Sequence, residues 1–375
     1  MGASLGLYVH IPFCESICNY CNFNRGLLDD DLKARYVEAL ETEIRRAGDG
    51  TQVDTIYFGG GTPSLLSASE MTDVLGACRS AFQVEPTAEI SLEVNPETAS
   101  SQRLDDWLQA GVTRLSFGVQ SFRDDELERL GRRHTADRAR EAVCLARSAG
   151  FDDVSLDLML WLPAQTRAHW RESVDALIDI APTHASLYLL ELYPNAPLKE
   201  EMARGGWSLA PDDDAAEMYL EALERTDAHG YEQYEISNIA RPSRQCRHNL
   251  KYWQGGEWLG FGCGAHSTRH GARWRNLSDT ERYITGVTAS ESVVAERHEL
   301  TEEERLGDRL FMGLRLTEGI DVRAIEQDHG VDVMARYGAA LTPFLDSAFL
   351  RLESGRLALT RQGMLVANEV METFI

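Results

Sequence analysis

The sequence predicts an α/β fold: a partial (βα)6 barrel followed by a small C-terminal α+β domain. Short apolar runs alternate six times with amphipathic helical patterns along the first 230 residues. Such alternation is typical of parallel strands joined by helical crossovers. Residues with distinctive chemistry fall at the carboxyl ends of the predicted strands, where parallel α/β folds place their sites. After about residue 231 glycine and aromatic residues concentrate instead.

The barrel is expected to be open on one side, because a closed barrel of this kind has eight strand–helix units. Ser67 and Glu70 form a capping box that starts the second helix, and Gly48 is expected to end the first. The expected strands are residues 5–12, 53–58, 89–94, 114–120, 154–162 and 185–192. The expected helices are residues 30–48, one that opens at the capping box, and 101–110, 136–149, 168–180 and 213–229.

Three parts are expected: the barrel at residues 1–230, a connecting β and aromatic segment at 231–299, and a C-terminal module at 300–375. Thr301 and Glu304 form a capping box at the start of this module. Residues 349–352 and 356–359 are expected to form a hairpin. Helices followed by a hairpin and a last helix are typical of a winged-helix-like module. We expect it to serve in packing or as a lid.

The composition excludes several classes of protein. The chain has 375 residues, 43% hydrophobic and 26% charged, which is ordinary for a globular protein. Its formal net charge of −23 argues against unaided binding to nucleic acid or to an anionic membrane surface. No signal peptide and no membrane-spanning segment is expected. Seven cysteines, three of them in one short loop, favour a reducing, cytoplasmic setting over a disulfide framework.

Cys14, Cys18 and Cys21 form a dense thiol cluster just after the first predicted strand. Four cysteines would saturate a four-iron cluster, so three leave one iron open to bind a small molecule. A zinc ion is the alternative, since His10 would complete a Cys₃His set. Ligand count alone leaves both alternatives open.

Further polar residues follow the other strands. The run from Gly59 to Pro63 lets backbone approach a ligand closely, because glycine lacks a Cβ. Glu93 ends the third strand and could pair with a cationic amine. Asp157 lies within an apolar strand, where a charge is costly unless it is paired or faces a polar cavity. These residues predict a binding site at the carboxyl edge of the barrel.

His248 stands in a pattern His-Asn-x-x-Tyr-Trp within the aromatic segment. A lone histidine is usually a structural residue, but imidazole is also a standard axial ligand for heme iron. His266 is a weaker second candidate.

The Cys-x₃-Cys-x₂-Cys loop resembles that of the radical S-adenosylmethionine (SAM) superfamily, and Tyr-x-His-Ile-Pro-Phe-Cys around it is similar to the anaerobic coproporphyrinogen III oxidase-like family. The resemblance covers nearly the whole chain. It implies a [4Fe-4S] cluster on the three cysteines, with the open iron binding the amino and carboxylate groups of SAM. The SAM contacts that it implies are Tyr8, Tyr20, Gly60, Gly61, Thr62, Glu93, Gln120, Arg132 and Asp157.

Within that family the resemblance favours the heme-chaperone branch over the oxidase, which decarboxylates coproporphyrinogen III. The oxidase has a further cysteine where this chain has Phe23, and an N-terminal extension that covers its substrate. The pattern around His248 is associated with heme binding in the chaperone branch. The implied partners are heme, heme-requiring apoproteins and an electron donor to the cluster. Nucleic acid is not expected as a partner, nor is the chain expected to be an integral membrane protein.

Overall fold

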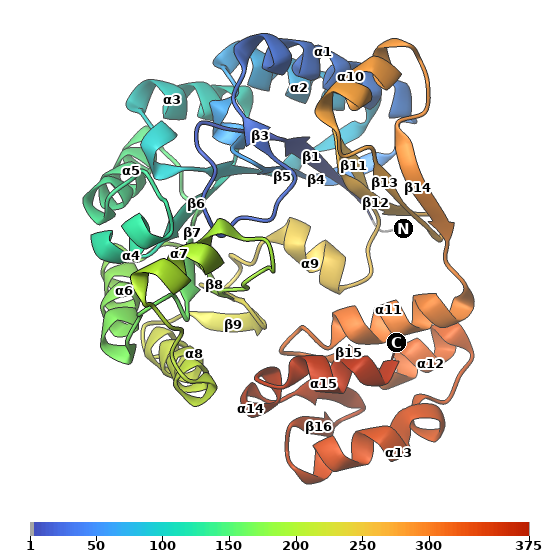
Figure 1. The fold of residues 1–375 in the computed structure, drawn as a ribbon. Coiled ribbons are helices and arrows are strands. Elements are labelled where there is room, and N and C mark those ends of the chain that lie inside the picture. The colour runs from blue at the N-terminus through green and yellow to red at the C-terminus, as the bar shows by residue number, and fades with distance from the viewer. Residues whose placement is uncertain (1–3, 375) are drawn as a thin grey trace.

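A twelve-stranded sheet dominates the computed structural model, which describes residues 4–374 (Figure 1). Its centre consists of β1 (Leu5–Ile11), β4 (Gln52–Gly60), β5 (Gln83–Val94), β6 (Arg114–Gln120), β7 (Val154–Leu160) and β8 (His184–Leu189). Each of these strands pairs in parallel with the next. The predicted partial barrel is therefore confirmed, with β5 beginning six residues earlier than the sequence pattern suggested.

Helices cover the outer face of these strands (Figure 1). The six crossover helices are α1 (Asp30–Ala47), α2 (Ala68–Ala81), α3 (Ser101–Ala110), α5 (Ala136–Ala149), α6 (Arg167–Ile180) and α8 (Asp212–Asp227). Two shorter helices, α4 (Asp124–Arg129) and α7 (Pro197–Gly205), lie in the connections. The predicted capping box of Ser67 and Glu70 is present at the start of α2. The apolar stripes of the crossover helices pack on the outer face of the strands to form one large core, whereas the inner face carries polar residues such as Ser91, Ser116 and Ser155.

Residues 231–299 add strands to both edges of this sheet. β9 (Glu232–Glu235) and β10 (Asn238–Ala240) continue it antiparallel beyond β8. At the other edge β11 (Trp258–Phe261) pairs in parallel with β1, and β12 (His266–Arg269), β13 (Ala272–Asn276) and β14 (Val294–Glu299) follow it antiparallel. The helix α9 (Arg247–Trp253) crosses the space between the two edges, and α10 (Thr280–Thr288) lies beside α1 (Figure 1). The division at residues 230 and 299 stays a prediction.

The C-terminal residues have a core of their own, with Leu310, Leu341 and Val370 fully buried in it. Its elements are α11 (Glu302–Gly313), β15 (Ile320–Asp321), α12 (Val322–His329), α13 (Val333–Asp346), β16 (Leu350–Glu353), β17 (Arg356–Leu359), α14 (Arg361–Met364) and α15 (Ala367–Met371). The capping box at Thr301 and the hairpin of β16 and β17 are both present as predicted.

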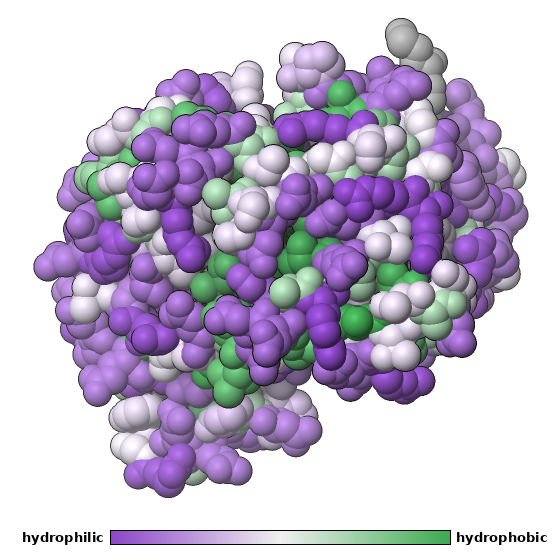
Figure 2. All heavy atoms as spheres, turned by 90° about the horizontal axis from the view of Figure 1, so that it is seen from above, coloured by the Kyte–Doolittle hydropathy of each residue, from purple (hydrophilic) through white to green (hydrophobic). Residues whose placement is uncertain are grey.

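Hydrophilic residues predominate on the face shown in Figure 2, and the hydrophobic ones form small patches near its middle. Within residues 4–374 no helix combines the length and the apolar character that crossing a membrane requires.

Glu43 on α1 ties the first helix to the strands that extend the sheet beyond β1. Its carboxylate accepts hydrogen bonds from the Gly262 backbone N–H (2.8 Å), the Asn276 amide (2.7 Å) and the Tyr283 hydroxyl (2.6 Å). Burial raises the pKa of Glu43 to about 7 although these three donors oppose the shift. The pKa of Glu43 is higher in the folded than in the unfolded protein, so protonated Glu43 stabilises the fold. This stabilisation is fully present below the unfolded pKa and is lost as the pH rises through about 7.

Replacing Glu43 with alanine is expected to lower the free energy of unfolding by about 1–3 kcal/mol, because three donors lose their acceptor. The loss relative to the wild type should be larger at pH 5 than at pH 8, as measured by urea unfolding at each pH. Glu38→Ala, at an exposed position of the same helix, is the control and should change little. A loss that is constant across this pH range would contradict the prediction.

Candidate functional site

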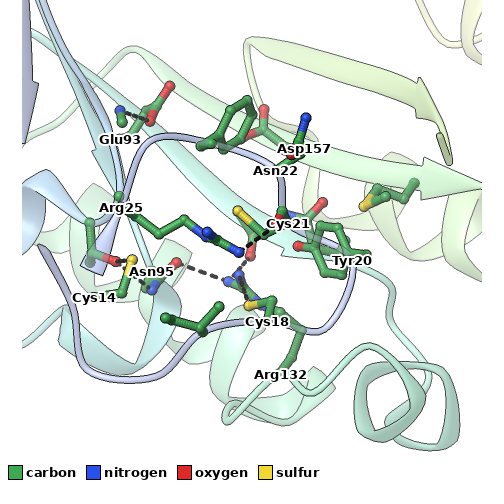
Figure 3. Close-up of a pocket in the computed structure, with 18 of the residues that line it drawn as sticks. Cys14, Cys18, Tyr20, Cys21, Asn22, Arg25, Glu93, Asn95, Arg132 and Asp157 are labelled. Carbon is green, nitrogen blue, oxygen red and sulfur yellow. Dashed lines mark hydrogen bonds between the residues drawn. The ribbon is translucent and has the colours of Figure 1, made fainter. Parts of the chain in front are cut away.

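A cavity of about 440 Å³ opens at the carboxyl ends of the central strands (Figure 3). The loop after β1, the glycine run after β4 and the ends of β5, β6 and β7 all contribute to its wall. Eleven residues predicted from the sequence line it together: Cys14, Cys18, Cys21, Tyr20, Gly60, Gly61, Thr62, Glu93, Gln120, Arg132 and Asp157. The parallel sheet thus brings together residues that lie up to 143 positions apart in the chain, from Cys14 to Asp157.

The loop that carries the three cysteines is held at both ends. Its flanks, β2 (Phe13–Cys14) and β3 (Gly26–Leu27), pair with each other in parallel. The backbone N–H of Gly26 donates to the Pro12 carbonyl (2.6 Å), and that of Leu28 to the Cys14 carbonyl (2.8 Å). The loop is therefore closed by backbone pairing, independently of any group that its thiols bind.

Polar donors surround the thiols. The Thr62 hydroxyl lies 3.5 Å from Cys14 Sγ, and Arg132 Nη1 lies 3.5 Å from Cys18 Sγ. Arg25 extends into the space between the three cysteines and donates to the Cys21 carbonyl (Figure 3). Donors and cations in these positions suit sulfur atoms that carry negative charge, as metal-bound thiolates do.

The zinc alternative does not fit this geometry. His10 is buried, and both of its ring nitrogens are engaged, one with the Tyr8 hydroxyl (3.1 Å) and the other with the Asn24 carbonyl (2.8 Å). Within the described residues no three His, Cys, Asp or Glu side chains are arranged to hold one metal ion. A four-iron cluster puts its thiolates on different iron atoms, so its ligands need not converge on one point. The three thiols around one cavity fit a cluster better than a single ion.

Gly60 and Gly61 lie so close to neighbouring atoms that a side chain at either position would collide with them. A Cβ on Gly61 would lie 2.8 Å from the Phe13 carbonyl oxygen and 3.0 Å from Cys14 Sγ. Gly60 has φ +116°, and a Cβ there would lie 2.6 Å from the His10 ring. Only glycine lets β4 pass so close to the cysteine loop.

Two carboxylates face the cavity from β5 and β7, the strands on either side of β6. Glu93 accepts from the Tyr57 hydroxyl (2.9 Å) and the Gly60 N–H (3.2 Å), and Asp157 from the Ser116 hydroxyl (3.2 Å). Burial, together with the charge of Asp157, raises the pKa of Glu93 to about 7, and burial also raises the pKa of Asp157. A cationic ligand between them would hold both carboxylates ionised, so this side of the cavity is built to receive a cation.

Arg132 and Gln120 shape the opposite part of the wall. Arg132 Nη2 donates to the Asn95 side chain (2.9 Å) and the Gly118 carbonyl (2.7 Å), which aims the guanidinium at the cavity. Gln120 has φ +69°, and the pairing of β6 with β7 is irregular beside it. A bulge of this kind redirects a side chain at the end of a strand, and here it turns Gln120 toward the site.

Two of the predicted site residues, Tyr8 and His248, do not line the cavity, and some residues that do line it were not predicted. Tyr8 lies beside the site, where its ring stacks on Tyr57. Arg25, Asn95 and Tyr188 line the wall without having been predicted. Asn95 follows Glu93 at spacing two, so the strand alternation could have revealed it, whereas no sequence signal places Tyr188.

His248 lies outside the cavity, and heme ligation by this residue stays a prediction. It is fully buried, and its ring nitrogens are engaged by the Thr55 hydroxyl (2.9 Å) and the Tyr252 hydroxyl (2.8 Å). Iron ligation by His248 would need one of these nitrogens to be free and within reach of a porphyrin. His266 is exposed on β12 and does not line the cavity either.

Comparison with known proteins identifies the family. The model of the Radical SAM superfamily matches residues 8–177, and that of the HemN C-terminal domain matches residues 300–366. The heme chaperone HemW of Bacillus subtilis is 35% identical over 373 residues, which cover 98% of each chain. The chain belongs to the HemW family of radical SAM proteins.

Other relatives agree with this assignment. The heme chaperone HemW of Escherichia coli is 40% identical over 268 residues, covering 70% of this chain and 69% of that protein. The mitochondrial radical S-adenosyl methionine domain-containing protein 1 of Danio rerio is 32% identical over 98% of this chain and 86% of its own length. The structure of the Escherichia coli coproporphyrinogen III oxidase HemN matches with a TM-score of 0.89 at 23% identity, covering 100% of this chain and 90% of that one. The HemW family therefore shares its fold with that oxidase.

Replacing Gly61 with alanine is expected to displace the cysteine loop, because the added Cβ meets backbone and sulfur within 3.0 Å. The free energy of unfolding should fall by about 1–3 kcal/mol, as for an overpacked core, and the loop thiols should react faster with a thiol reagent. Gly76→Ala on α2 is the control, since no heavy atom lies within 4 Å of its added Cβ. Equal stability and thiol reactivity in the two variants would show that the close approach is unimportant.

Proposed function

We propose that this protein binds heme and transfers it to apoproteins, and that it carries a [4Fe-4S] cluster and binds SAM in the same cavity. Relatives named heme chaperone HemW that align along nearly the whole chain support the heme part of the proposal. Membership of the radical SAM superfamily supports the cluster and SAM.

The observation that carries heme binding is an apolar rim around the mouth of the cavity. Ten large hydrophobic side chains of residues 4–374 are well exposed, and five of them line this one cavity. These five, named here the apolar rim, are Ile17, Phe23, Tyr188, Leu189 and Tyr193. Exposed apolar side chains gathered in one place mark a binding surface. A flat, largely apolar macrocycle such as heme fits such a rim, and Arg25 in the same wall can pair with a propionate.

The cavity beneath the rim supports the proposed roles of the other residues. Cys14, Cys18 and Cys21 hold the cluster, and Glu93 and Asp157 bind the cationic amine of SAM. Tyr20, Gly60, Gly61, Thr62, Gln120 and Arg132 line the space that would receive the rest of it. A bound cluster would supply the electron for reductive cleavage of SAM.

The remaining partners follow from this chemistry. A cluster that is to be reduced needs an electron donor, and heme transfer needs recipient apoproteins. We also propose a cytoplasmic location, which is supported by seven cysteines that are all free of disulfide bonds.

Replacing Phe23 or Leu189 of the apolar rim with serine is expected to weaken heme binding about ten-fold or more, because burying a side chain of this size contributes about 1.5–3 kcal/mol. Absorbance titration with heme measures the dissociation constants. Leu352→Ser is the matched control, since Leu352 is similarly exposed but lies on the C-terminal hairpin. If all three variants bind heme like the wild type, the rim is not the heme site. Efficient conversion of coproporphyrinogen III by the same preparation would favour the oxidase activity instead.

Serine in place of Cys14, Cys18 and Cys21 together is expected to abolish the cluster. After anaerobic reconstitution the wild type should hold about four iron atoms and the triple variant almost none, as measured by iron and sulfide analysis and by electron paramagnetic resonance of the reduced protein. Cys144→Ser serves as the control, because Cys144 is exposed on α5 and lies outside the cavity. A wild-type protein that retains a single zinc ion would contradict the proposal.

A further inference from the structure

The pattern His-Asn-x-x-Tyr-Trp lies on α9, against the inner face of the barrel. The carboxylate of Glu89 on β5 accepts from the backbone N–H of Arg247 (2.8 Å) and of His248 (3.2 Å) at the start of this helix. Asp54 on β4 pairs with Lys251 (2.9 Å) one turn later. The helix is thus attached to β4 and β5, the two strands that also carry Tyr57 and Glu93.

His248 is linked to the cavity through Tyr57, which contacts the lining residue Glu93. The two rings stack at a centroid distance of 5.3 Å and an interplanar angle of 26°. The Tyr57 hydroxyl then donates to Glu93 Oε1 (2.9 Å). Tyr57 and Thr55 share one face of β4, so His248 packs on one and hydrogen-bonds the other. A continuous series of contacts therefore runs from the motif to the carboxylate that faces the cavity.

The surroundings of His248 match an uncharged imidazole. Burial, with the nearby Lys251, lowers the pKa of His248 to about 3. A neutral ring has one N–H and one acceptor nitrogen, and the hydroxyls of Thr55 and Tyr252 can each complement either one. The two hydrogen bonds orient the imidazole ring of His248. Because the Tyr57 ring stacks on this imidazole, the orientation of the imidazole also fixes the position of Tyr57.

Glu93 depends on few donors. Within the described residues its oxygens accept only from the Tyr57 hydroxyl and the Gly60 N–H. Among the charged groups near it, Asp157 disfavours its charge and Arg114 favours it. The hydroxyls of Tyr8, Tyr188 and Tyr252 also lie within range of its charge. Loss of the Tyr57 hydrogen bond would leave a buried carboxylate with a single donor beside a second carboxylate, where its charge is costly.

We infer that His248 is a positioning residue that holds Tyr57, and through it Glu93, in place for the amine of SAM, and that it does not ligate heme iron. The inference rests on the proposed binding of SAM at Glu93. It assigns the motif a role in the base of the SAM cavity, whereas heme binds at the apolar rim.

The test uses the full-length reconstituted protein and SAM itself as the probe. Tyr57→Phe removes only the hydrogen bond to Glu93 and is expected to weaken SAM binding about five- to ten-fold. His248→Ala should weaken it to a similar extent, and His248→Phe, which keeps a ring to stack on Tyr57, should recover part of the loss. If His248 acts through Tyr57, the double variant Tyr57→Phe/His248→Ala binds SAM no more weakly than the weaker single variant. If the losses of SAM affinity in the two single variants add fully in the double variant, the inference is overturned.

Heme titration of the same His248 variants separates the two roles. The dissociation constant for heme is expected to be unchanged in His248→Ala. Loss of heme binding with unaltered SAM affinity would overturn the inference and restore His248 as a heme ligand. Thermal unfolding identifies any variant that fails to fold, and Tyr57→Phe, the smallest change, then carries the test alone.

A measurement without SAM distinguishes failure of this inference from failure of the proposed function. Carboxyl resonances of protein labelled with ¹³C at glutamate follow the ionisation of Glu93, which Glu93→Gln assigns. The titration midpoint of Glu93 should rise by about one pH unit in Tyr57→Phe, which is a ten-fold decrease in the acid dissociation constant of its carboxyl group. His248→Ala should shift it in the same direction. A midpoint unchanged in both variants overturns the inference, whether or not the wild type binds SAM.

Discussion

The parallel pairing of the six central strands is the constraint on which the rest of this molecule depends. It brings the carboxyl end of every strand to one edge, so the loop after β1, the glycines after β4 and the ends of β5, β6 and β7 surround one cavity. Strands buried on both faces can contribute polar side chains only at this edge or toward the barrel interior. The cysteine loop closes over the edge because β2 and β3 pair with each other and because Gly61 leaves room beside Cys14.

The cavity combines charges that would be costly in isolation. Glu93 on β5 and Asp157 on β7 stand on either side of β6 with few donors, whereas the cationic Arg132 lies on the other side near Cys18. The charge of Asp157 raises the cost of ionising Glu93, so a ligand amine beside them would relieve that cost, and a ligand carboxylate could pair with Arg132. The residues therefore suit a zwitterionic ligand such as the amino-acid part of SAM, next to thiols that suit a cluster.

The interior and the rim of the barrel offer two different environments. Aromatic rings fill the interior and support the carboxylate, among them the half-buried Tyr8 and Tyr57 and the buried His248. Exposed apolar side chains gather at the mouth, from the cysteine loop on one side and from the end of β8 and the segment after it on the other. A small polar ligand is suited to the first environment, and a large flat apolar ligand to the second.

The sequence by itself determined the order of strands and helices, the partial barrel and eleven residues of the cavity wall, because hydrophobic periodicity and loop motifs are local properties of the chain. It could not determine that residues 231–299 would extend both edges of the sheet, since strand partners far apart in sequence are chosen by packing. Nor could it place Tyr188 in the cavity wall. The surroundings of His248 were decided by tertiary structure alone: a motif shows which atoms could ligate iron, but only the folded chain shows that the hydroxyls of Thr55 and Tyr252 hydrogen-bond both ring nitrogens.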